Sequence, residues 1–169
     1  MKILSILAQK PSSTGSGIYL TELLKSFYKM GEEQAVVYGV TKEDKLPEFS
    51  GVKAYPVYYE SENLPFPVLG MSDEMPYDST VYSKMSEHDY EVWINNFKEK
   101  LLHIKEDFDP DIIIAHHVFI LSSLVCEVFA DKKIITLSHS TDVRQLMKNP
   151  WILEKYMPHI KEADECICV

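Results

Sequence analysis

Short apolar runs alternate with longer stretches of helical periodicity along the whole chain. The apolar runs predict strands at residues 2–7, 35–40, 52–58, 112–115, 133–137 and 166–169. Apolar side chains at three- and four-residue spacing indicate helices at residues 17–30, 89–108, 119–129 and 151–163, the last broken near Pro158. Strands that alternate with helices are typical of an α/β fold. We therefore expect a doubly wound, mostly parallel sheet flanked by helices, which is a Rossmann-like architecture.

One long stretch, residues 61–83, follows neither period. It carries three prolines and a glycine, and large apolar side chains lie between them: Phe66, Met71, Met75 and Tyr77. A loop this long in a compact domain is commonly functional, and its apolar content predicts that it orders against a surface. Pro56 lies within the third predicted strand and cannot donate a ladder hydrogen bond, so this strand is expected near an edge of the sheet.

The chain of 169 residues is long enough for one core, so we expect residues 1–169 to form a single Rossmann-like domain. Its net charge of −9 opposes binding to a phosphate backbone, which argues against a nucleic-acid partner. The three cysteines lack framework spacing and predict free, buried thiols in a reducing compartment. The amino-terminal apolar run is too short for a secretory signal, so a cytoplasmic location is expected. The apolar strand at residues 166–169 is expected to lie at a domain boundary.

In open α/β sheets ligands bind outside the carboxyl ends of the strands, so the residues that follow strands matter most. The loop after the first strand ends in Gly15-Ser16-Gly17, where a helix begins. Backbone N–H groups and the helix dipole at such a point suit an anion. The dinucleotide-binding fingerprint is not met, because its third glycine would fall at Leu20 and no acidic residue closes the second strand. A flexible loop without a ligand is the alternative for these residues.

Two other strands deliver polar side chains to the same edge. His116 and His117 follow the fourth strand, and alternation along a strand predicts that one faces the cleft while the other packs. The fifth strand leads to His139, which suits a hydrogen bond to a sugar hydroxyl or a phosphate oxygen. Asp142 is expected to cap a following helix. No spacing typical of metal ligands connects these residues, so no metal is expected.

Four segments in order carry a resemblance to a known family. They are the first strand with its Gly-x-Gly loop, then PDIIIAHHVFILSSL at residues 110–124, TLSHSTDV at 136–143 and ADECICV at 163–169. The last three resemble the Pro-Asp-hydrophobic-x-His-x-His strand, the His-Gly-Thr-Asp segment and the closing Ala-Asp strand of the retaining GT-B glycosyltransferases, family 4. Ser140 stands where that family usually has glycine, a position at which a positive φ would suit glycine better than serine.

The resemblance implies the N-terminal, acceptor-side half of an enzyme that moves a sugar from a nucleotide sugar to an acceptor with retention. A C-terminal domain that binds the nucleotide sugar is absent from this chain, and neither a metal nor another cofactor is implied. Carried over by position, Gly15, Ser16 and Gly17 lie near the donor diphosphate. His139 lies near the reacting centre, and the acceptor side is lined by His116, His117 and Asp142.

Two other classes of function stay open beside the transferase. A stand-alone, flavodoxin-like module would bind a small anion at Gly15–Gly17 without catalysis. A hydrolase would use His139 and Asp142, but the Gly-x-Ser-x-Gly motif of a nucleophile elbow does not occur in the chain. The mixed charges of residues 87–108 leave membrane association open.

Overall fold

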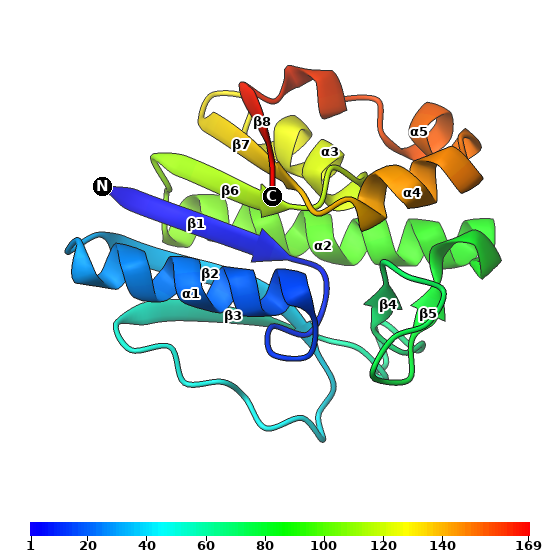
Figure 1. Cartoon of the computed structure of the whole chain (residues 1–169), viewed down its shortest axis with the longest axis horizontal. Coiled ribbons are helices and arrows are strands. Elements are labelled where there is room, and N and C mark those ends of the chain that lie inside the picture. The colour runs from blue at the N-terminus through cyan, green and yellow to red at the C-terminus, as the bar shows by residue number, and fades with distance from the viewer.

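The computed structural model describes all 169 residues and contains a six-stranded, fully parallel sheet. Its strands are β1 (Lys2–Leu7), β2 (Glu33–Val40), β3 (Val52–Tyr58), β6 (Ile112–His116), β7 (Lys133–Ser138) and β8 (Glu165–Cys168). They lie in the order β3-β2-β1-β6-β7-β8, so the order reverses between β1 and β6 (Figure 1). This confirms the predicted doubly wound fold. A sheet of this order has its ligand crevice at the carboxyl ends of the two strands that flank the reversal.

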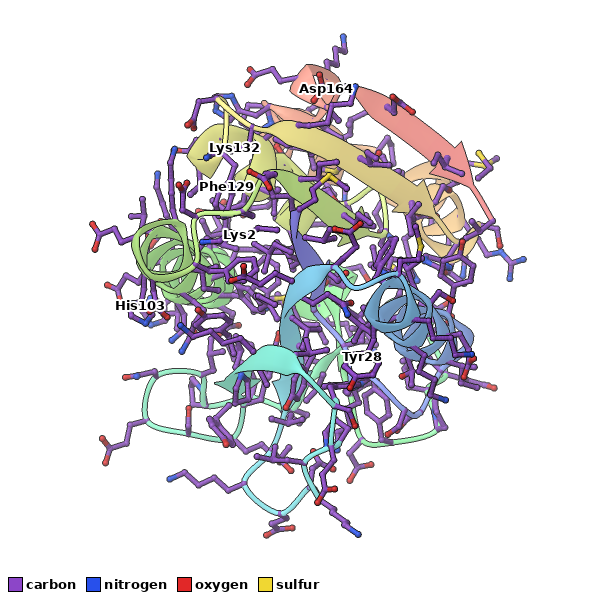
Figure 2. The ribbon with its side chains drawn as sticks, turned by 90° about the vertical axis from the view of Figure 1, so that its left-hand side faces the viewer. Lys2, Tyr28, His103, Phe129, Lys132 and Asp164 are labelled. Atoms are coloured by element: carbon purple, nitrogen blue, oxygen red, sulfur yellow. The ribbon has the colours of Figure 1, made fainter.

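Helices cover both faces of the sheet. Helix α1 (Gly15–Lys29) lies on one face, and α2 (Glu87–Asp107) and α3 (Ile120–Val128) lie on the other (Figure 1). Figure 2 looks along the sheet from the amino ends of its strands. There Tyr28 of α1 and His103 of α2 stand on opposite sides of the strands.

The side chains that cap the helices explain where two of them begin. Helix α1 starts two residues before the predicted position, because the Thr14 hydroxyl accepts a hydrogen bond from the Gly17 N–H at 3.1 Å. Helix α2 also starts two residues early, at Glu87. Ser86 and Asp89 form a capping box, in which each side chain bonds the other residue's backbone N–H.

The larger core lies between the sheet and helices α2 and α3, and aromatic side chains fill its centre. Trp93 is fully buried, its ring centroid is 4.5 Å from that of Phe97, and its Nε1 donates to the Tyr59 hydroxyl at 2.7 Å. A smaller apolar cluster, which includes Leu20 and Leu24, packs beneath α1. The aromatic core fixes α2 against the strands whose loops build the site described below.

The irregular stretch is ordered, as its apolar content predicted. It holds a short parallel pair of strands, β4 (Leu69–Gly70) and β5 (Thr80–Val81), and Leu64 and Met71 are buried in the larger core. Residues 71–79 connect this pair beside the carboxyl edge of the sheet (Figure 1), and their first part, residues 71–76, is called the covering segment from here on. Both ends of this connection are therefore anchored.

The C-terminal third differs from the prediction in two respects. The sequence pattern missed α4 (Thr141–Lys148) as a separate helix, which precedes α5 (Trp151–Tyr156) and a 3-10 turn at Ile160–Glu162. Of the three thiols only Cys126 is buried, since Cys166 and Cys168 lie exposed on the edge strand β8. The other edge strand is β3, as Pro56 predicted.

No helix in the structure has both the length and the hydropathy that a membrane span requires.

Candidate functional site

The loops that follow β1, β6 and β7 meet at one cavity of about 310 Å³. The loop after β1 and the first turn of α1 contribute Gln9 and residues 13–16 to its wall. His117 and His139 come from the loops after β6 and β7, and the covering segment closes the opposite side. The structure thus brings together three segments that are far apart in the sequence, at the edge where the strand order reverses.

The amino end of α1 presents unpaired backbone donors to this cavity. The N–H groups of Gly15 and Ser16 have no acceptor within the protein, and the first turn contains no acidic residue. Ser16 is buried, and its hydroxyl donates to Gln9 Oε1 at 3.2 Å while lying 3.0 Å from the Thr14 hydroxyl. Free N–H groups and the positive end of the helix dipole together attract an anion.

The two glycines of this turn serve different purposes. A Cβ on Gly15 would meet nothing within 4 Å, so the backbone there is open to the cavity. A Cβ on Gly17 would lie 2.6 Å from the Pro11 carbonyl oxygen and 2.8 Å from that of Lys10. Gly17 is needed because α1 packs closely against the preceding loop, and it does not line the cavity.

Three histidines gather at the ends of β6 and β7. His116 Nδ1 and His139 Nε2 are 3.2 Å apart, and the two rings are stacked with centroids 5.3 Å apart. The His117 ring centroid is 4.8 Å from that of His139. The prediction that one of the two adjacent histidines faces the cleft while the other packs is confirmed, because His117 lines the cavity whereas His116 is buried and does not. Both rings still neighbour His139, because strand β6 ends at His116 and His117 has φ = 70°, so strict strand alternation no longer applies.

Burial keeps the two adjacent histidines uncharged. It lowers the pKa of His116 and of His117 to about 3, with a smaller contribution from the neighbouring imidazole of His139. The pKa of His139 is lowered too, mainly by burial, although Asp142 opposes the shift. At neutral pH the site offers neutral imidazoles, each with one donor and one acceptor nitrogen.

Hydrogen-bonding capacity is left over in this buried cluster. His117 Nε2 donates to Gln9 Oε1 at 3.1 Å, which leaves its Nδ1 as an acceptor without a partner. Gln9 Nε2 and His116 Nε2 also lack partners, although these three residues are each at most 3% exposed. A buried polar atom without a partner destabilises a protein by about 1–3 kcal/mol, so such a concentration is typical of a binding site.

Asp142 ties the loops after β6 and β7 together. Its carboxylate is completely buried and accepts from the backbone N–H of Val118 at 2.7 Å and from the Ser138 hydroxyl at 3.1 Å. The expectation that it caps the following helix is wrong. The N-cap is Ser140, whose side chain makes no capping bond, and Asp142 lies inside the first turn of α4. It does not line the cavity.

Two parts of the site were not among the residues that the sequence predicted for it. Tyr19 of α1 is 40% exposed, and its ring lies in T-shaped contact with those of His116 and His139, with centroids 6.0 and 5.7 Å away. The covering segment reaches the cavity only through the tertiary fold, and Asp73 holds it to α4 by accepting from Gln145 at 3.2 Å and pairing with Lys148. In the sequence, only the prolines and methionines of the covering segment indicated that it would order against another surface of the protein.

No group of three or more histidine, cysteine, aspartate or glutamate side chains is arranged to hold a metal ion.

No family model matches the chain, and no curated protein matches it in sequence. Several solved structures share its fold. Sucrose-phosphate synthase from Thermosynechococcus elongatus matches with a TM-score of 0.58 at 14% identity, over 87% of this chain and 35% of that one. UDP-GlcNAc 2-epimerase from Neisseria meningitidis bound to UDP-GlcNAc gives 0.55 at 15% identity, over 96% and 37%. Arabidopsis thaliana UGT89C1 complexed with UDP gives 0.53 at 13% identity, over 99% and 41%.

These similarities establish the architecture. The chain has a Rossmann-like fold of the kind found in GT-B glycosyltransferases and epimerases. It spans less than half the length of each of these structures.

Proposed function

We propose that this chain is the acceptor-side half of a glycosyltransferase that uses a nucleotide sugar and retains the configuration at the anomeric carbon. One observation carries the proposal: a single cavity is lined by the residues with free N–H groups at the start of α1 and by Gln9 and His117, each of which has a buried polar atom without a partner. The amides suit a diphosphate, and the neutral polar side chains suit sugar hydroxyls. A second domain supplies the nucleotide site, and no metal takes part.

We assign a role to each residue from its position relative to this cavity. Gly15 and Ser16 direct free amides at the donor diphosphate, and His139, the proposed catalytic residue, hydrogen-bonds the donor sugar from the cavity wall. His117 lies beside it on the acceptor side. His116 and Asp142 are buried outside the cavity wall, so we assign them the positioning of His139 and of its loop. Gly17 allows α1 to approach the loop before it.

The transfer needs stabilisation where charge develops. As the glycosidic bond breaks, its electron pair passes to the diphosphate oxygen, and amides already aimed there stabilise that charge without reorganising. A single donor of this kind contributes about 3 kcal/mol to lowering the barrier. The acceptor hydroxyl forms the new bond on the same face of the sugar and releases its proton to the departing phosphate.

The competing hypothesis is an anion-binding module without catalysis, which the free N–H groups of α1 would serve equally well. Titration of the ¹⁵N-labelled chain with UDP and with uridine tests the shared binding step. We expect UDP, but not uridine, to shift the amide resonances of Gly15 and Ser16. Gly15→Ala should weaken UDP binding about tenfold by displacing the diphosphate, with unchanged thermal stability. Ser12→Ala, in the same loop but outside the cavity, is the matched control.

Catalysis is tested in the protein expressed from its complete reading frame. Transfer from a panel of UDP- and GDP-sugars is measured for the wild type and for His139→Ala, and the anomeric configuration of the product is read by proton NMR. Loss of a transition-state donor should lower the rate about a hundredfold or more. A rate within about threefold of wild type removes His139 from the mechanism, and an inverted product refutes retention. Binding of UDP without any transfer would favour the anion-binding module.

A further inference from the structure

A second hollow adjoins the candidate cavity on the side of α4. This recess measures about 220 Å³ and is walled by α4 and the covering segment. It shares four residues with the larger cavity: Met71, Ser72, Glu74 and Thr141. The two spaces are therefore contiguous, and a ligand seated in the recess can extend towards His139.

Helix α4 turns hydrogen-bond donors towards the recess. Its wall on this side consists of Thr141, Arg144, Gln145 and Lys148. These positions are spaced by three and four residues, so they share one face of the helix. Each of the four side chains carries an O–H or N–H group.

Some of these donors are already engaged and others are free. Asp73 of the covering segment accepts from Gln145 and pairs with Lys148. Arg144 is the only arginine in the chain, and while its backbone N–H donates to the Ser140 carbonyl oxygen, its guanidinium forms no ion pair and no hydrogen bond. The hydroxyls of Thr141 and Ser72 are also without partners. An unpaired guanidinium beside two free hydroxyls is suited to an oxyanion, because its planar fork matches a carboxylate or a phosphate.

We infer that the recess binds an anionic group of the acceptor, a carboxylate or a phosphate, through Arg144. This inference rests on the proposed function, since it names the class of acceptor for the same site. Arg144 donates two parallel N–H bonds to the anion, and Thr141 and Ser72 donate their hydroxyl hydrogens. The rest of the acceptor passes over Thr141 into the larger cavity, where its nucleophilic hydroxyl meets the donor sugar near His139.

Glu74 sets a limit on this acceptor. Its carboxylate belongs to the wall of both spaces and has no ion-pair partner. A second negative charge at the junction would be repelled by Glu74. The site therefore selects an acceptor with one anionic group and a neutral, hydroxyl-bearing remainder.

The test is an NMR titration of the ¹⁵N-labelled chain with inorganic phosphate and, separately, with lactate. We expect the amides of residues 141–145 to shift with at least one of the two anions, and the tighter one identifies the acceptor's group. Arg144→Gln should weaken this binding about tenfold or more, and Arg144→Lys less, because lysine keeps the charge but loses the fork. Glu74→Gln should tighten it. Lys161→Gln, which removes an exposed cation from the 3-10 turn at Ile160–Glu162 outside the recess, is the control and should change nothing.

Two results would overturn the inference. One is that Arg144→Gln binds the anion as tightly as the wild type, and the other is that neither anion shifts the amide resonances of α4. Arg144 is exposed, so neither variant is expected to disturb the fold, and an unchanged thermal midpoint confirms this.

The recess and the proposed function fail separately. The UDP titration reports on Gly15 and Ser16, whereas phosphate and lactate binding at the recess report on α4. If UDP shifts no amide at Gly15 or Ser16 while an anion still shifts the amides of α4, only the proposed nucleotide-sugar site is refuted. If UDP shifts Gly15 and Ser16 but neither phosphate nor lactate shifts α4, only the inference of an anionic acceptor is refuted.

Discussion

Replacing Ser140 by glycine should stabilise the protein. Ser140 has φ = 64° and ψ = −33°, and the turn around it is closed by a hydrogen bond from the Thr141 N–H to the His139 carbonyl oxygen at 2.8 Å. This is a γ-turn with positive φ, a conformation that strains any residue with a Cβ. The Ser140 side chain is exposed and makes no hydrogen bond, so nothing in it offsets the strain.

The magnitude follows from two opposing effects. A non-glycine residue in a sparsely populated positive-φ region raises the free energy of the folded state by about 1–3 kcal/mol. Glycine also gains conformational freedom in the unfolded chain, which opposes the benefit by about 0.4–1 kcal/mol. The net expectation is about 1 kcal/mol, which for a chain of this length corresponds to a rise of about 2–4 °C in Tm.

Urea unfolding followed by tryptophan fluorescence measures this change, because Trp93 is buried in the core. Ser140→Ala is the matched control. It keeps the Cβ and removes only an unbonded hydroxyl, so its stability should stay within about 0.5 kcal/mol of the wild type. If Ser140→Gly were no more stable than Ser140→Ala, the strain argument would be refuted.

Three further predictions concern the same edge of the sheet. Gly17→Ala should destabilise the fold by about 1–3 kcal/mol in urea unfolding, since its Cβ would meet backbone 2.6 Å away, whereas Gly15→Ala should be neutral. Burial lowers the pKa of His116 and of His117 from 6.5 to about 3. Between pH 6.5 and pH 3 the unfolded chain therefore binds protons that the folded chain does not bind. The free energy of unfolding is thus largest above pH 6.5 and should fall by about 1–2 kcal/mol for each of these two histidines by pH 5, and His117→Gln should make this pH dependence shallower by removing one contribution. Asp142→Asn should destabilise by about 1–3 kcal/mol, because an amide cannot accept all the bonds of the buried carboxylate. An Asp142→Asn variant as stable as the wild type would show that the two loops hold together without it.

Most of the fold was predictable because the spacing of apolar residues within each strand and helix indicates which faces it buries. Strands β1 and β6 are apolar on both faces since they lie in the middle of the sheet, and α1 and α2 carry apolar stripes towards it. The rule that parallel strands gather their carboxyl ends at one edge was enough to place Gly15, His117 and His139 together. The missed helix α4 has only eight residues, so its apolar side chains, Val143, Leu146 and Met147, span a single turn, and the side chains that it buries, Asp142 and Gln145, are polar.

The detailed site was decided by contacts between distant segments. The sequence by itself determined the order of strands and helices, the edge of the sheet at which the candidate site lies and the kinds of side chain delivered there. Only the tertiary structure decided that His116 bonds His139, that Asp142 joins two loops instead of capping a helix, and that residues 71–76 cover the cavity. The reason is physical. Periodicity reports what each element buries, whereas the φ values of His117 and Ser140 are held by long-range packing and hydrogen bonds that no local pattern encodes.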